Sequence, residues 1–287
     1  MVHIITDTTA CLPTDTAERF HIPVIPQILV LGSESYKEGS EIDHATFMQW
    51  LRTSSEMPKT AAPPPELFTE EFKRLVPTGE PILCIHPSCE VSGTVRSATI
   101  AAQDFPDADI RIIDTRTIGS TLMTMVTLAA GWAEAGEDAD TIETRLRQEF
   151  IPNCRIYFLV ATLEFLAKGG RIGGAAALLG SVLQIKPILV MNDGKVDQFE
   201  RERTHRRALV RLKELILQDM PPHLAEHVSV MHAGVPDQAA ELAEFLRQQF
   251  NLEKVPVVDI PPAIVTHAGP GVLCAGFFMD QNQPSTD

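Results

Sequence analysis

The sequence is poor in basic residues. It contains 24 Lys and Arg against 38 Asp and Glu, which leaves a formal net charge of −14 with histidine neutral. Long-range repulsion between such a chain and a phosphate backbone or an anionic membrane works against non-specific binding to either. We therefore expect no nucleic acid among its partners.

Paired cysteines are also missing. The cysteines at positions 11, 84, 89, 154 and 274 are odd in number and scattered, and none forms a Cys-x-x-Cys pair. Disulfide frameworks and zinc sites normally show closely spaced ligands. The sequence predicts no metal site, and nothing in it calls for a cofactor.

Uninterrupted apolar runs long enough to cross a membrane are absent. The two long segments without Asp, Glu, Lys or Arg, 117–133 and 260–279, are broken by Gly, Thr, Ser, Pro or His. Such residues disfavour a membrane span. The first seven residues lack the basic region of an export signal. We expect a cytoplasmic protein.

Strand-like runs alternate with helical patterns over the first half of the chain. The predicted strands are Val2–Thr6, Val24–Leu31, Ile82–Ile85 and Ile110–Asp114. The predicted helices lie near 14–20, 43–53, 65–75, 91–104, 117–135 and 138–150. This alternation predicts an α/β domain with a doubly wound, mostly parallel sheet over residues 1–153. The chain length of 287 residues favours a second domain.

The pattern changes after residue 153. The predicted strands are 155–161, 185–191, 195–202, 227–232, 255–260 and a last apolar strand that ends at Met279, with helices at 204–218 and 236–250. Asn192-Asp193-Gly194 predicts a hairpin turn. The second half is therefore predicted to be an α+β domain over 154–282, followed by a loose tail at 283–287.

Four short segments carry side chains that suit chemistry. They are the proline-rich loop 58–65 with Thr60, the segment 87–94 with Ser92, the glycine run 169–174 with Arg171, and the segment 266–271 with His267. A serine beside free N–H groups at a helix start suits an anion such as a carboxylate, and glycines around a histidine let a ligand approach closely. Taken singly, each also fits a structural role: a capping linker, a serine N-cap, a turn and a structural histidine.

Two other functional classes fit these segments less well. The glycine run around Arg171 does not satisfy G-x-G-x-x-G and lacks the Lys-Ser/Thr ending of a phosphate-binding loop, which disfavours a nucleotide-binding protein. A serine hydrolase with Ser92 as nucleophile, His267 as base and Asp7 as acid is the alternative function. Glu90 and Thr94 stand where the G-x-S-x-G elbow needs glycine.

The ordered set of segments resembles the DegV family of bacterial fatty-acid-binding proteins over nearly the whole chain. The residues that carry the resemblance are Ile4-Ile5-Thr6-Asp7-Thr8, Lys59-Thr60, Val91-Ser92-Gly93-Thr94, Lys168-Gly169-Gly170-Arg171-Ile172, Lys186-Pro187-Ile188-Leu189, Arg203-Thr204 and Thr266-His267-x-Gly269-Pro270-Gly271. The resemblance implies a carrier rather than an enzyme, with one long-chain fatty acid held in a tunnel between two domains. A partner fatty acid kinase would phosphorylate its carboxylate for phospholipid synthesis.

The resemblance also implies roles for individual residues. Thr60, Ser92 with Gly93, and His267 match the positions that grip the fatty-acid carboxylate, so we expect a head-group site built without a fixed positive charge. Arg171 and Arg203 match positions tied to kinase docking or the phosphoryl step. The basic residues of segment 201–214 would suit an acidic kinase surface or a transient contact with an anionic membrane.

Overall fold

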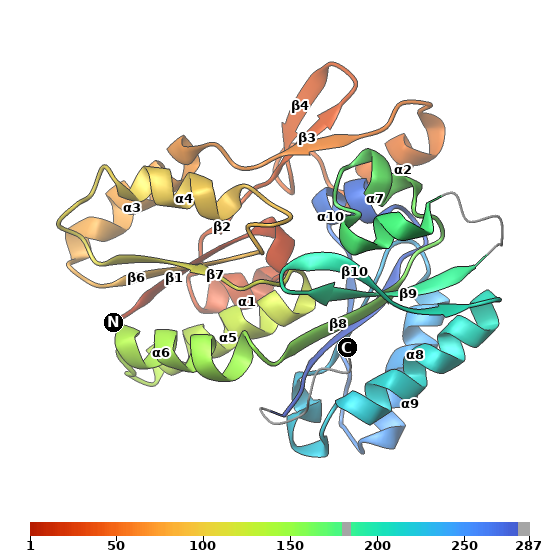
Figure 1. The fold of residues 1–287 in the computed structure, drawn as a ribbon. Coiled ribbons are helices and arrows are strands. Elements are labelled where there is room, and N and C mark those ends of the chain that lie inside the picture. The colour runs from red at the N-terminus through yellow and green to blue at the C-terminus, as the bar shows by residue number, and fades with distance from the viewer. Residues whose placement is uncertain (180–184, 281–287) are drawn as a thin grey trace.

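The computed structural model describes residues 1–179 and 185–280, so the predicted loose tail at 283–287 lies outside the described residues (Figure 1). The first sheet is parallel throughout, with the strand order β2-β1-β6-β7. Its strands are β1 (His3–Asp7), β2 (Val24–Ile25), β6 (Ile82–His86) and β7 (Ile110–Asp114). The predicted parallel sheet of the first half is confirmed.

Helices cover both faces of this sheet (Figure 1). They are α1 (Thr14–Arg19), α3 (Pro65–Leu75), α4 (Thr94–Ala102), α5 (Ser120–Glu134) and α6 (Ala139–Arg145), the last continuing into a π-helical turn, Leu146–Phe150. Successive side chains of a strand point to opposite faces. Accordingly, Ile5 packs in one core with Phe68 of α3, and Ile4 packs in the other with Leu122 of α5.

A small antiparallel sheet with the order β4-β3-β5 projects from this domain (Figure 1). It consists of β3 (Ile28–Leu31), β4 (Glu34–Lys37) and β5 (Lys59–Ala61), and α2 (His44–Thr53) connects β4 to β5. The predicted single strand Val24–Leu31 is wrong, because β2 and β3 belong to different sheets. Pro26 lies between them and has no N–H to continue a ladder.

The second half is built on a six-stranded sheet with the order β10-β9-β8-β13-β11-β12, antiparallel except for the last pair. The strands are β8 (Cys154–Leu159), β9 (Lys186–Asn192), β10 (Lys195–Glu202), β11 (Ser229–His232), β12 (Val257–Asp259) and β13 (Leu273–Phe278). Two helices, α8 (His205–Asp219) and α9 (Pro236–Gln249), pack on one face. The predicted α+β character is confirmed.

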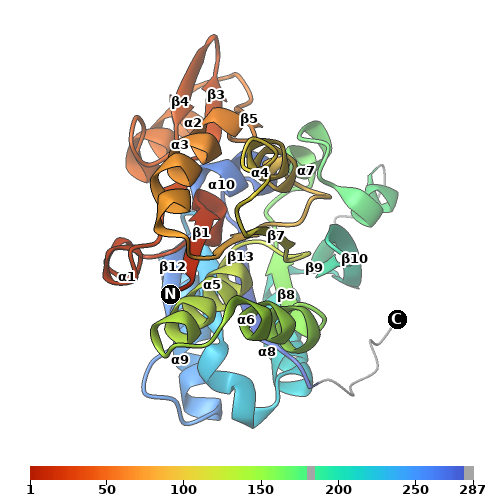
Figure 2. The ribbon, with the colours of Figure 1, turned by 90° about the vertical axis from the view of Figure 1, so that its left-hand side faces the viewer.

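The other face of the six-stranded sheet turns toward the first half of the chain (Figure 2). Short helices fill this region: α7 (Glu164–Lys168), a 3-10 helix (Gly173–Leu178) and α10 (Pro262–Ala268). His267, which the sequence analysis assigned to no helix, lies in α10. Pro262 starts this helix, where proline is well tolerated, and Gly269 with φ +82° ends it.

No helix within the described part of the chain combines the length and the apolar character needed to cross a bilayer.

Candidate functional site

A cavity lies between the two halves of the chain and encloses about 930 Å³ of space, part of it open to solvent. One wall is formed by the 3-10 helix Thr8–Ala10, by β5 and by the loop before α4. The opposite wall is formed by β8, β9, β13 and α10. The predicted ligand site between the two domains therefore corresponds to a real cavity.

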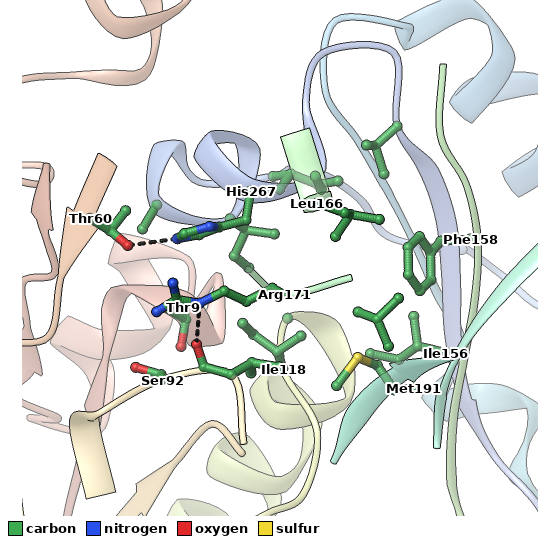
Figure 3. A pocket seen from close by; sticks show the side chains of 18 of the residues that line it. Thr9, Thr60, Ser92, Ile118, Ile156, Phe158, Leu166, Arg171, Met191 and His267 are labelled. Atoms are coloured by element: carbon green, nitrogen blue, oxygen red, sulfur yellow. Dashed lines mark hydrogen bonds between the residues drawn. The ribbon is translucent and has the colours of Figure 1, made fainter. Parts of the chain in front are cut away.

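The two ends of the cavity differ in character (Figure 3). Thr60, Ser92, Arg171 and His267 bring polar atoms to one end, and the Oγ1 of Thr60 lies 2.7 Å from Nε2 of His267. The other end is lined by apolar side chains, among them Ile156, Phe158, Leu166 and Met191. This distribution suits a ligand with one polar head and a long apolar body.

His267 is held as a neutral imidazole. Burial lowers its pKa to about 4, and the positive charge of Arg171 acts in the same direction. Its Nδ1 has no hydrogen-bond partner in the described residues and faces the backbone of Gly169, where an added Cβ would overlap it. At neutral pH this side chain therefore offers one N–H and one lone pair, and it does not supply a charge.

Ser92 lies in the loop between β6 and α4. Its Oγ accepts a hydrogen bond from the N–H of Thr94 at 3.3 Å and lies 2.7 Å from the Oγ1 of Thr94. The N-cap position of α4 belongs to Gly93, which also lines the cavity, so Ser92, which the sequence favours as the N-cap, lies one residue before the observed cap. Ser88 anchors the loop, because its hydroxyl donates to the carbonyl of Gly194 at 2.8 Å.

Arg171 lines the cavity beside the other polar groups. Its Nε donates to the carbonyl of Val91 at 3.2 Å and its Nη1 to the carbonyl of Gly169 at 2.7 Å. The expectation of a head-group site without a fixed positive charge is wrong. Gly170, with φ +71°, turns the chain after α7, so the next side chain returns to the cavity.

Arg203 is placed elsewhere. It is exposed between β10 and α8 and is not among the cavity-lining residues, so the structure does not bring it to Arg171. Within segment 201–214, Arg211 and Lys213 are occupied by ion pairs with Glu200, Glu214 and Glu241. Arg203, Arg206 and Arg207 are exposed and form no ion pair with any described residue.

The arrangement needed for a serine hydrolase is not present among the described residues. Nε2 of His267 faces Thr60 rather than Ser92. Asp7 pairs through its Oδ2 with Nδ1 of His86 at 2.8 Å, so it does not orient His267. A nucleophile needs a base within hydrogen-bond reach. The geometry therefore does not support the hydrolase alternative.

The sequence missed much of the cavity wall. The uncharged segment 117–133 and the apolar run 172–185 are obvious candidates for the wall by composition, but of the first only Ile118 and Gly119 line the cavity, and none of the described residues of the second does. Ile156 and Phe158 of β8 line it instead. Their spacing of two residues was the available signal, because alternate strand residues share one face. Thr9 and Gln27 also line the cavity, and no local pattern pointed to them.

Residues 1–280 match a family model described as "Uncharacterised protein, DegV family". A DegV domain-containing protein of Streptomyces coelicolor is 37% identical over 274 residues, which cover 95% of this chain and 96% of that protein. A DegV family protein from Thermus thermophilus, described by its fatty acid binding, matches with a TM-score of 0.87 and 30% identity; the match covers 97% of this chain and 99% of that chain. DegV from Bacillus subtilis, described as a fatty acid binding protein, matches with a TM-score of 0.86 and 28% identity; this match also covers 97% of this chain and 99% of that chain.

Proposed function

Because the chain belongs to the DegV family, we propose that it binds one long-chain fatty acid in the cavity between its two halves. The observation that carries this proposal is the gathering of Thr60, Ser92 and His267 at one end of an otherwise apolar cavity. The descriptions of similar solved structures as fatty-acid-binding proteins support it.

The polar end provides what a buried carboxylate requires. A carboxylate in an apolar cavity without donors would be costly, so several donors must converge on it. If Nε2 of His267 carries the proton, it donates to Thr60, and the hydroxyl hydrogen of Thr60 is free for the ligand. Ser92, the backbone of Gly93 and the guanidinium of Arg171 complete the head-group site.

The apolar end accounts for affinity. Burying about 15 methylene groups at about 0.8 kcal/mol each contributes about 12 kcal/mol before the ordering of the ligand is subtracted. This is enough for a fatty acid to remain bound during purification.

We further propose that the protein is a carrier and not itself an enzyme. It presents the carboxylate to a partner fatty acid kinase, which phosphorylates it to an acyl phosphate for phospholipid synthesis. This places the protein in the cytoplasm of a bacterium and needs no cofactor in the carrier. Arg171 would act close to the phosphoryl step, since it lines the cavity, and the exposed Arg203 would act in docking.

The proposed function is tested by lipid content and by two head-group variants. We expect one fatty acid per chain by native mass spectrometry, identified in an organic extract. Ser92→Ala removes a hydrogen bond to the carboxylate, and His267→Ala removes the partner that leaves the hydroxyl hydrogen of Thr60 free for it, so each is expected to bind oleate about tenfold more weakly. Ser97→Ala and His223→Ala, outside the cavity lining, are the matched controls. A protein that is empty and refuses both oleate and palmitate would contradict the proposal.

The docking role is tested by reversing two exposed charges. We expect Arg203→Glu combined with Arg206→Glu to slow acyl phosphate formation by the partner kinase about tenfold, most strongly at low salt, because opposite charges steer association. Oleate affinity should not change. Arg19→Glu combined with Lys254→Glu alters the net charge equally and serves as the control. An equal loss of bound oleate in the Arg203 and Arg206 variant would argue against docking.

A further inference from the structure

A chain of buried polar groups runs behind the head-group site. Nε2 of Gln27 donates to Oδ1 of Asp7 at 3.0 Å and to Oγ1 of Thr94 at 2.8 Å, and Thr94 meets Ser92 at 2.7 Å. Asp7 and Thr94 are fully buried, and Gln27 is 3% exposed. The chain begins at the end of β1 and ends at the cavity, where Ser92 is half-buried.

The donor and acceptor of each hydrogen bond in this series follow from Asp7, the residue at its buried end. Oδ1 of Asp7 accepts from the N–H of Thr9 at 3.0 Å and from its hydroxyl at 2.6 Å, so Oδ1 acts as an acceptor. An acceptor there requires the amide nitrogen of Gln27, not its oxygen, to face Asp7. The same nitrogen then donates its second hydrogen to Thr94.

Thr94 accepts from Gln27 and therefore donates to Ser92. A threonine hydroxyl has one hydrogen to donate, and the described residues offer Oγ1 of Thr94 only two partners, Gln27 and Ser92. Since Gln27 is a donor, the hydrogen of Thr94 goes to Ser92. Ser92 also accepts from the N–H of Thr94, so both lone pairs of its oxygen are used. Its own hydrogen is left for the cavity.

We propose that Gln27 and Thr94 are positioning residues that make Ser92 a hydrogen-bond donor toward the ligand. Asp7 sets the direction of the chain, and His86 holds Asp7 from the other side through Nδ1. This proposal rests on the proposed function and adds a specificity to it: the cavity favours a head group that only accepts hydrogen bonds, a carboxylate, over one that also donates, such as an alcohol.

The test compares two ligands with the same apolar chain. Delipidated wild type, Thr94→Val and Thr94→Ser are titrated with radiolabelled oleate and oleyl alcohol. Valine has the shape of threonine without the donor, so Thr94→Val is expected to bind oleate about tenfold more weakly. Its affinity for oleyl alcohol should change less than about twofold, because Ser92 can then accept from the alcohol. Thr94→Ser keeps the hydroxyl and should restore oleate binding.

Three outcomes would overturn the inference or its premise. Wild-type oleate affinity in Thr94→Val would show that the chain does not orient Ser92. If Thr94→Val lost affinity equally for oleate and oleyl alcohol, had a lowered melting temperature and was not rescued by Thr94→Ser, the role of Thr94 would be structural only. A wild-type protein that binds neither ligand would contradict the proposed function itself.

Gln27→Met removes the amide that donates to Thr94. This variant should shift the preference from oleate toward oleyl alcohol, as Thr94→Val does.

Discussion

Gly169→Ala is expected to lower the affinity for oleate on the order of 100-fold. An added Cβ at this position would overlap Nδ1 of His267 and lie 2.9 Å from the carbonyl oxygen of Phe165. The imidazole must therefore leave Thr60, and α7 must shift from α10. Without the N–H of His267, the hydroxyl hydrogen of Thr60 is no longer reserved for the carboxylate, and losing a hydrogen bond to a buried charged group costs up to about 3 kcal/mol, which accounts for a change of this size. Equilibrium binding of oleate to the delipidated variant measures it.

Gly170→Ala is the matched control for this variant. Its φ of +71° makes alanine strained there, but apart from its two chain neighbours no described residue has an atom within 4 Å of an added Cβ. We expect this variant to lose about 1 kcal/mol of stability and to keep its affinity for oleate. Equal affinities in the two variants would show that contact with His267 at Gly169 does not matter for binding.

The buried carboxyl of Glu38 is expected to make the free energy of unfolding fall by about 3 kcal/mol as pH rises, and Glu38→Gln is expected to abolish this fall. Burial raises the pKa of Glu38 from 4.5 to about 7, although hydrogen bonds from the hydroxyl of Thr8 and from the N–H of Ala263 act in the opposite direction. Because the pKa is higher in the folded state, the stability contributed by this carboxyl is fully present below about pH 4.5 and is lost as pH rises through about 7.

Urea unfolding at several values between pH 5 and pH 8 measures this effect. The free energy of unfolding of the wild type should fall with rising pH relative to that of Glu38→Gln. Glu18→Gln, which removes an exposed carboxylate, has the same net charge and serves as the control. A difference between Glu38→Gln and Glu18→Gln that stays constant across this range would contradict the prediction.

The structural importance of Glu38 comes from what it joins. Thr8 belongs to the first half of the chain, and Ala263 lies in the first turn of α10, the helix that carries His267. Both of these hydrogen bonds favour the ionised carboxyl, so the cost of its ionisation comes from burial and not from the contact with α10.

The sequence by itself determined the local structure and the family. Alternating strand and helix patterns predicted the parallel sheet, since periodicity is a local property of the chain. Aspartate is a favoured N-cap residue, and Asp43 caps α2, where its Oδ1 accepts from the N–H of Thr46 at 2.7 Å. The order and spacing of Thr60, Ser92 and His267 indicated the DegV family, and the family model confirms it.

Only the tertiary structure decided how distant groups meet. Thr60 and His267 are separated by 207 positions, and Gln27 and Thr94 by 67, so no local pattern could pair them. The entry of Arg171 into the cavity depends on a turn at Gly170 and on a carbonyl supplied by Val91. Local propensity cannot specify such contacts, because they arise only when separate elements pack and must satisfy one another's buried polar groups.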